Sequence, residues 1–272
     1  MSRVSRIFVY PIKSCRGIEV SSAELTHRGL EFDRRYMLVD ADGRFLTQRQ
    51  HPRMALIEPA FGDGGLAVNA PDRRPLSIPL GIDSDAHATC KVRIWADTVE
   101  ATLADAETNV WFSEFMGFAC GLVYLADSQH RAVPNPAAAF EDEVGFADGA
   151  PLMLLSDASL ADLNRRLEHA VGIERFRPNV VVTADEPYAE DEWQRIIIGA
   201  ARLDVAWPCS RCGLTTVDPA TGERDAAGEP LRTLRGYRRR DRKVYFGQNL
   251  IPRALGTIEV GAECAIDEII EQ

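Results

Sequence analysis

The most informative segment of this chain is a pair of cysteines followed by β-favouring residues. It reads Pro208-Cys209-Ser210-Arg211-Cys212-Gly213-Leu214-Thr215-Thr216-Val217-Asp218-Pro219. Gly213 and the residues after it disfavour the helix that a thioredoxin-like dithiol opens. A structural zinc site needs four ligands, but the chain has no second Cys-x-x-Cys and no histidine after His169.

Two interpretations of this segment remain open from the spacing alone. In the first, one thiolate is the ligand of a soft or high-valent metal, and Arg211 beside it favours the ionised sulfur. In the second, both cysteines are buried on a tight turn and carry no chemistry.

Outward from this segment, the chain reads mostly as short strands separated by turns. Strand-like patterns occupy residues 6–10, 36–39, 54–57, 66–69, 91–95, 121–125, 179–183, 195–198, 201–207, 243–246 and 257–260. A helix is expected over residues 106–116, and Ser156 or Asp157 caps a second one. Residues 126–150 combine prolines, alanines and an acidic cluster, which indicates a loop or a domain junction. We therefore expect a mainly β protein with a few helices.

Composition narrows the functional classes further. The 272 residues carry a net charge of −10, which disfavours general binding of nucleic acid. No apolar run approaches the roughly 20 residues of a membrane span, and the N-terminus shows no signal-peptide core. Six scattered cysteines do not form a disulfide scaffold. We expect a cytoplasmic protein that binds neither nucleic acid nor membrane.

Several further motifs occur in a fixed order along the chain. They are Tyr10-Pro11-Ile12-Lys13-Ser14-Cys15, Asp33-Arg34-Arg35, Leu155-Ser156-Asp157-Ala158-Ser159-Leu160-Ala161-Asp162-Leu163-Asn164, Phe176-Arg177-Pro178-Asn179, the cysteine segment and Phe246-Gly247-Gln248. Each alone is weak, since a surface Lys or Arg is usually a solvated charge. As an ordered set they resemble the MOSC-domain proteins, and within them the amidoxime-reducing components of mitochondria and their bacterial YcbX-like relatives.

The resemblance implies an α+β, mainly β fold. It has an N-terminal MOSC β-barrel-like domain over residues 1–125, a MOSC β-barrel domain over residues 126–272, and a few helices. It also implies a molybdenum cofactor (Mo-molybdopterin) with Cys212 as the metal ligand and catalytic residue. The cofactor-binding positions that it implies are Lys13, Ser14, Arg35, Arg177, Asn179, Ser210, Arg211 and Gln248.

The reaction that the resemblance implies is reduction of small N-hydroxylated compounds, with removal of the N–O oxygen at molybdenum. Asp148 and Asp218 are candidate proton donors, or else carboxylates that cap turns. The alternative function is a carrier of sulfur or of the molybdenum cofactor, related to the C-terminal domains of cofactor sulfurases.

Electrons for such a reductase are expected from a separate protein of ferredoxin, flavodoxin or haem type. Many bacterial relatives have a fused iron–sulfur domain, but Cys264 alone cannot hold a cluster that takes four thiolates. Residues 235–243 hold six cations and one acid in a net acidic chain, so we predict that Arg235–Lys243 is the docking segment. A solvated loop that exchanges salt bridges is the alternative.

Overall fold

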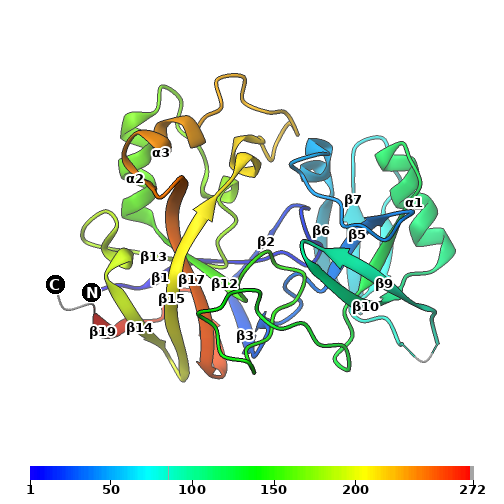
Figure 1. The fold of residues 1–272 in the computed structure, drawn as a ribbon, viewed down its shortest axis with the longest axis horizontal. Coiled ribbons are helices and arrows are strands. Elements are labelled where there is room, and N and C mark those ends of the chain that lie inside the picture. Colours follow the sequence, from blue (N-terminus) through cyan, green and yellow to red (C-terminus); the bar gives the residue numbers. More distant parts are fainter. Residues whose placement is uncertain (85, 270–272) are drawn as a thin grey trace.

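A computed structural model describes residues 1–84 and 86–269 of the chain. Its strands form one large sheet and three smaller ones, with three α-helices packed around them (Figure 1). The expected α+β, mainly β fold with a few helices is therefore confirmed. In the described part of the chain, no helix is both long and apolar enough to cross a membrane.

The large sheet combines strands from the two ends of the chain. Its order is β19 (Cys264–Ile269), β14 (Trp193–Ile198), β15 (Ala201–Arg211), β17 (Lys243–Ala254), β12 (Leu152–Ser156), β13 (Val180–Val182), β1 (Val4–Val9) and β2 (Ile18–Val20), with β16 (Arg239–Arg240) paired to β17. Strand β1 thus lies in the same sheet as strands that follow residue 150. The division of the chain at residues 125 and 126 stays a prediction.

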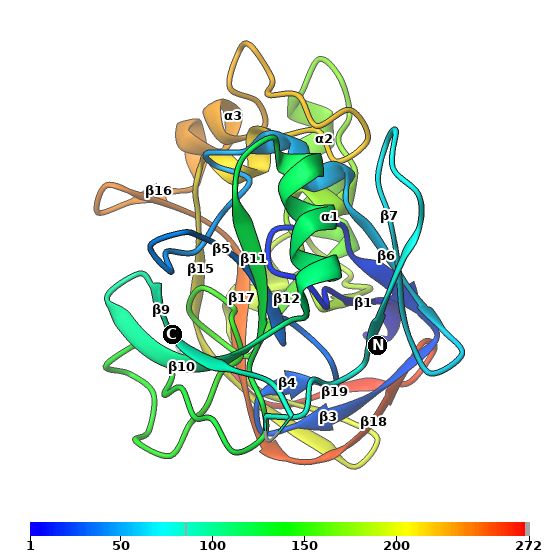
Figure 2. The same ribbon diagram turned by 90° about the vertical axis from the view of Figure 1, so that its right-hand side faces the viewer.

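The smaller sheets contain the remaining strands. One has the order β5 (Tyr36–Asp40), β11 (Cys120–Tyr124), β10 (Asp97–Leu103) and β9 (Thr89–Ile94). The other two are β18 (Gly256–Glu259), β3 (Ser22–Thr26) and β4 (Gly29–Leu30), and β6 (Glu58–Gly62), β7 (Gly65–Asn69) and β8 (Leu76–Pro79). Figure 2 shows α1 (Ala106–Met116) lying alongside β11.

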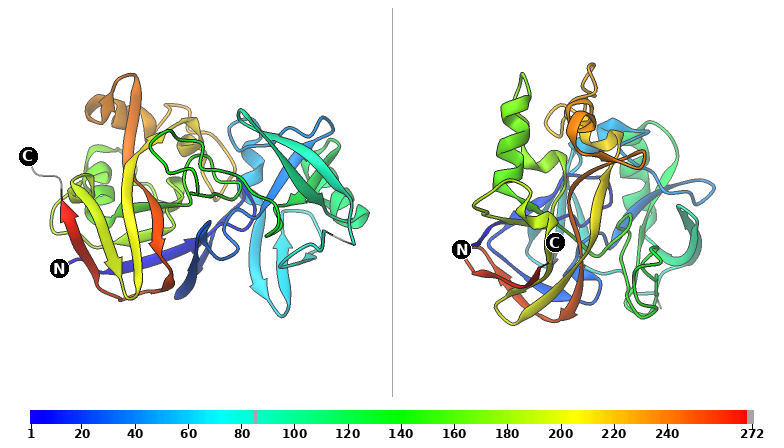
Figure 3. Two further views of the ribbon diagram at one scale, coloured as in Figure 1. Left: turned by 60° about the horizontal axis from the view of Figure 1, so that its bottom comes forward. Right: turned by 60° about the vertical axis from the view of Figure 1, so that its left-hand side comes forward.

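The centre of the large sheet is buried on both faces, because consecutive apolar side chains of its strands point to opposite sides. In β12, Leu152 and Leu154 belong to one core cluster, whereas Met153 and Leu155 belong to another on the opposite face. A strand that is covered on both faces reads as a continuous apolar run rather than an alternating one. Helices α2 (Asp157–Arg166) and α3 (Leu231–Tyr237) pack together at one end of the molecule (Figure 3).

The two predicted helices are confirmed by their caps. The side chain of Asp105 accepts a hydrogen bond from the Thr108 amide at 2.7 Å, and Gly117 ends α1 in a left-handed conformation. Ser156 accepts from the Ser159 amide at 3.1 Å and so begins α2.

One predicted strand is wrong. Residues 54–57 fall mostly in the 3₁₀ helix Pro52–Leu56, with Ile57 as its C-cap. Pro52 has no amide hydrogen to give to a sheet, and its fixed φ suits the first turn of a helix. The apolar run that suggested a strand instead places Met54 and Ala55 in the core.

Candidate functional site

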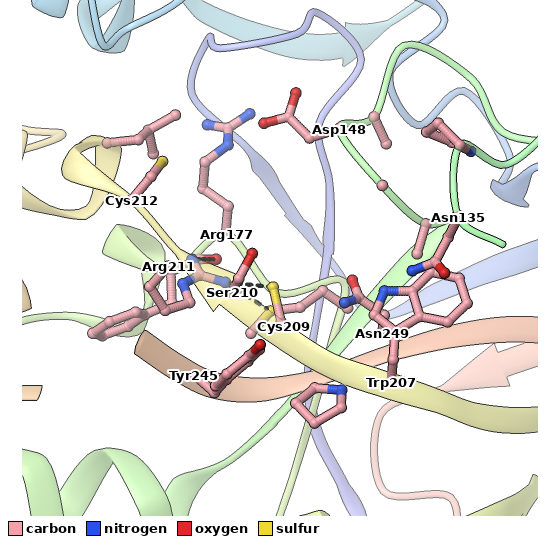
Figure 4. A pocket seen from close by; sticks show the side chains of 18 of the residues that line it. Asn135, Asp148, Arg177, Trp207, Cys209, Ser210, Arg211, Cys212, Tyr245 and Asn249 are labelled. Atoms are coloured by element: carbon pink, nitrogen blue, oxygen red, sulfur yellow. Dashed lines mark hydrogen bonds between the residues drawn. The ribbon is translucent and has the colours of Figure 1, made fainter. Parts of the chain in front are cut away.

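A cavity of about 910 Å³ lies where the end of β15 meets loops from the first half of the chain (Figure 4). The residues that line it are Lys13, Ser14, Arg34, Arg49, Trp95, Ala96, Asp97, Pro134, Asn135, Ala147, Asp148, Gly149, Ala150, Leu152, Met153, Phe176, Arg177, Asn179, Trp207, Pro208, Cys209, Ser210, Arg211, Cys212, Leu214, Thr215, Arg240, Asp241, Lys243, Tyr245 and Asn249.

Cys212 presents its sulfur to this cavity. The residue follows the last residue of β15 and precedes the 3₁₀ helix Gly213–Thr216, and its carbonyl accepts the Thr215 amide at 3.2 Å. The backbone is therefore held, while the side chain is exposed and accepts a hydrogen bond from Arg49 Nη1 at 3.8 Å. Because this sulfur is exposed, the interpretation of two buried cysteines does not fit.

Cys209 has a different environment three residues earlier. Its sulfur accepts a hydrogen bond from Arg211 Nη1 at 3.0 Å, and the half-buried side chain packs against the apolar cluster that includes Phe246. The sequence predicts that Arg211 lies beside the sulfur of the candidate metal ligand. The structure corrects that prediction: Arg211 contacts Cys209, and the cation beside Cys212 is Arg49.

Lys13 is buried in the cavity wall and paired with Asp148. Its ammonium donates to the Phe146 carbonyl at 2.7 Å and to the Asp148 carboxylate. Burial lowers the pKa of Lys13 to about 8, although the carboxylate opposes that shift. For Asp148, burial disfavours ionisation, but the Lys13 charge outweighs it and lowers the pKa well below its ordinary value.

A second charged cluster surrounds the ring of Tyr10. The guanidiniums of Arg34 and Arg177 lie 4.3 and 4.2 Å from the ring centroid. Arg34 Nη1 also donates to the Asp33 carboxylate at 2.6 Å and to the Asn179 side-chain oxygen at 2.8 Å. Burial lowers the pKa of Arg177 to about 10. The Asn179 amide, bonded on both sides, holds this cluster in place.

The charge of the lining favours an anionic ligand. Seven cationic side chains line the cavity against three carboxylates. Arg211 Nε is buried and has no hydrogen-bond partner among the described residues. An unpaired buried donor is costly unless a ligand satisfies it. The lining therefore fits a metal that is bound by the exposed Cys212 thiolate and carried on an anionic, phosphate-bearing group. The excess of cations and the unpaired Arg211 Nε would bind the anionic part of that group.

Most predicted site residues meet in this cavity. Lys13, Ser14, Arg177, Asn179, Ser210, Arg211 and Cys212 all line it. Arg35 does not, because its guanidinium turns away to the Leu125 carbonyl at 2.9 Å and to Asp127 at 2.8 Å. Arg34 occupies the lining position instead.

Gln248 is also outside the cavity. Successive side chains of a strand point to opposite faces, and Asn249, the next residue of β17, lines the cavity. Gln248 therefore points the other way, and its Nε2 donates to Asp191 at 2.6 Å. Simple alternation in the sequence does not give this orientation, because Gly247 has a φ of +80° and the buried residues Phe246 and Leu250 belong to core clusters on opposite faces of the sheet.

Arg49 and Trp95 were missed as site residues by the sequence reasoning. Arg49 lies over the Trp95 ring at 4.2 Å from its centroid and reaches the Cys212 sulfur. Neither position carries a periodic signal, since one lies in a loop and the other in a hairpin turn. Only the tertiary contact between them shows their relation to the thiol.

Comparisons with known proteins identify the family of this chain. The family model of the MOSC N-terminal beta barrel domain matches residues 1–119, and that of the MOSC domain matches residues 141–265. The chain belongs to the MOSC-domain family. Human mitochondrial amidoxime-reducing component 1 is 36% identical over 274 residues, which cover 95% of this MOSC chain and 81% of the human protein.

Two further similarities extend the comparison. Human mitochondrial amidoxime reducing component 2 is 34% identical over 274 residues, covering 95% of the chain and 81% of that protein. The crystal structure of the YUAD protein from Bacillus subtilis aligns with a TM-score of 0.45 at 13% identity, covering 97% of this chain and 94% of that one. Both human relatives are named for amidoxime reduction.

Proposed function

We propose that this chain is a molybdenum-cofactor-dependent oxidoreductase that reduces N-hydroxylated compounds. The observation that carries the proposal is the exposed Cys212 sulfur in a cavity whose lining is rich in cations. A soft thiolate suits a high-valent metal that cycles by two electrons. Its similarity to proteins named amidoxime-reducing components supports the same reaction class.

The lining divides naturally between the metal and its organic part. Cys212 would bind the metal, while Lys13, Ser14, Arg34, Arg177 and Arg211 would surround the phosphate and the pterin. A buried dianion needs charge-assisted donors from several directions. When bound, the cofactor supplies the oxygen-atom chemistry that breaks the N–O bond.

Other residues of the chain would act on the substrate side. The Asp148 carboxylate, ionised because Lys13 is beside it, offers an acceptor for substrate N–H groups. Arg49 Nη1 keeps a positive charge at the Cys212 sulfur. Both groups line the same open cavity of about 910 Å³ as the Cys212 sulfur.

We further propose that a separate acidic electron carrier docks at residues 235–243. Arg239, Arg240, Arg242 and Lys243 are exposed on the β16–β17 hairpin, and two of them, Arg240 and Lys243, line the cavity. Arg238 is not free to take part, because it donates to Asp191 at 2.5 Å and lies over Tyr188.

The six free thiols support a reducing compartment such as the cytoplasm.

Metal analysis combined with turnover tests the proposed function. The freshly isolated protein should contain molybdenum and a fluorescent pterin, and it should reduce benzamidoxime when an artificial one-electron donor is supplied. A protein that instead carries a persulfide on a cysteine after anaerobic purification, without molybdenum or turnover, would be the sulfur carrier of the alternative interpretation.

Charge reversal tests the docking proposal. The double variant Arg240→Glu/Arg242→Glu should slow electron delivery from an acidic donor protein severalfold at low salt and little at high salt, because salt screens exposed charges. Arg202→Glu, an exposed arginine at the opposite end of β15, is the matched control and should change nothing. An unchanged salt dependence in the double variant contradicts docking here.

A further inference from the structure

Trp95 is held in a backbone conformation that its side chain disfavours. Ile94 and Asp97 pair across the β9–β10 hairpin, so Trp95 and Ala96 form its two-residue turn. The φ of Trp95 is +56°, in the left-handed region where bulky side chains are outliers. Such strain is retained mainly where the surrounding structure or a function requires it.

The ring of Trp95 is also unusually exposed. Its exposure is 49%, against 8% for Trp111 and 5% for Trp193. The ring lines the cavity that contains Cys212, and it belongs to the wall contributed by the first half of the chain. A large aromatic surface is therefore left open to whatever enters the cavity.

Three contacts fix the orientation of this ring. Its Nε1 donates to Asp148 Oδ1 at 3.1 Å, and the Arg49 guanidinium lies 4.2 Å from the ring centroid. The Phe45 ring packs against it with 5.1 Å between centroids. Because Arg49 also reaches the Cys212 sulfur at 3.8 Å, the ring is tied to the proposed reaction centre.

We propose that Trp95 is a specificity-determining residue, whose exposed surface stacks against the planar π-system of an aryl-substituted N-hydroxylated substrate. This inference rests on the proposed function and adds a preference for aryl amidoximes and N-hydroxylated aromatic bases over small aliphatic analogues. An oriented ring loses little freedom when a second ring stacks on it, so the gain in affinity is selective for aromatic ligands.

Replacement by asparagine separates stacking from folding. Asn tolerates positive φ far better than Trp, so Trp95→Asn relieves the turn while it removes the ring. Trp95→Phe keeps an aromatic face but loses the hydrogen bond to Asp148. Phe61→Ala is the matched control, because Phe61 is an exposed aromatic residue outside the cavity.

The experiment measures binding and turnover of two ligands by the metal-loaded protein. Dissociation constants for benzamidoxime and acetamidoxime come from calorimetry, and KM values from turnover with an artificial donor. In Trp95→Asn we expect benzamidoxime to bind about tenfold more weakly and acetamidoxime to change less than twofold, with thermal stability equal or higher. Trp95→Phe should stay within about threefold of the wild type, and Phe61→Ala should be unchanged.

Two results would overturn the inference. An equal loss for both ligands would make Trp95 a support for Arg49 and Asp148, and no loss for either would leave the ring without a role in binding. Failure of the proposed function is separate: the wild type would then turn over neither compound, whereas the calorimetric contrast between the two ligands still decides whether Trp95 binds aryl groups.

Discussion

The two walls of the cavity are built in opposite ways. One wall is the end of β15, which hydrogen-bonds to β17; Cys209 is half-buried on this strand, and Cys212 is exposed just after it. The other wall consists of loop and turn residues such as Lys13, Arg49 and Asp148, which hold one another by charge. The regular strand fixes the proposed metal ligand, and the loops supply the charges around it.

This contrast indicates where each wall tolerates change. A site on a strand is positioned by many backbone bonds, so removal of one side chain changes chemistry more than geometry. A site made from paired charges depends on each partner, because an unpaired buried charge is costly. The predictions below challenge the two walls in turn.

The largest effect is expected on the strand wall, at the two cysteines. Cys212→Ser should lower molybdenum content and benzamidoxime turnover at least 100-fold, because among the described sulfur-bearing side chains that line the cavity Cys212 alone is exposed. Cys209→Ser should keep most of both, since Arg211 and the apolar cluster engage that side chain. Metal analysis and turnover of both variants are the measurements. The reverse ranking would mean that Cys209 is the ligand.

On the loop wall, two neighbouring arginines should behave differently. Arg34→Gln removes the charged partner of the buried Asp33, so we expect a loss of about 2–4 kcal/mol in unfolding free energy and a severalfold lower metal content. Arg35→Gln should cost about 1 kcal/mol and leave the metal in place, because its guanidinium contacts Leu125, Asp127 and the Tyr124 ring, none of which lines the cavity. Denaturant titration and metal analysis check both. An equal loss of metal in the Arg34→Gln and Arg35→Gln variants would show that Arg35 belongs to the site.

The last prediction is a pH dependence of the same wall, which is confined to alkaline pH. Lys13 has a pKa of about 8 in the folded chain against 10.5 for an ordinary lysine. Between these values the unfolded chain binds the extra proton, so this group makes the protein more stable as pH rises from about 8 to 10.5. The gain is on the order of 3 kcal/mol. Below pH 8 its contribution is constant.

Lys13→Met provides the comparison for this prediction. Urea titration from pH 7 to 10.5 gives the unfolding free energy of each protein. The difference between the two should stay constant up to about pH 8 and then change in favour of the wild type as the pH rises. A constant difference across the whole range would show that Lys13 stays protonated in the folded protein.

Much of the fold and part of the site could be predicted from the sequence. The helix over residues 106–116 and the cap at Ser156 are local features, which can be predicted from a single sequence. The motifs around Lys13, Arg177 and Cys212 identified a family, and the structure brings them to one cavity. Met54 and Ala55 show the limit, since a short apolar run fits a strand or a helix equally.

The remaining site residues depend on contacts between distant segments. Arg34 and Arg35 are adjacent, and the left-handed φ of Arg34 (+48°) removes any alternation that could tell which one turns inward. Trp95 and Arg49 are 46 positions apart, and no local pattern joins them. Gln248 also depends on the fold, because Gly247 interrupts the alternation of β17 and the partner Asp191 lies 57 positions earlier in the chain.

The position of β1 in the large sheet sets an order of events during biosynthesis. Val4–Val9 pairs with Val180–Val182, and Lys13 precedes Cys212 by 199 positions. At about 5–20 residues per second, a ribosome needs roughly 10–40 s to span that interval. Over that interval the nascent N-terminal strand lacks its partner β13, and a chain that has not reached Cys212 cannot enclose a ligand between Lys13 and Cys212. Any ligand that needs both residues must therefore bind after Cys212 has been made.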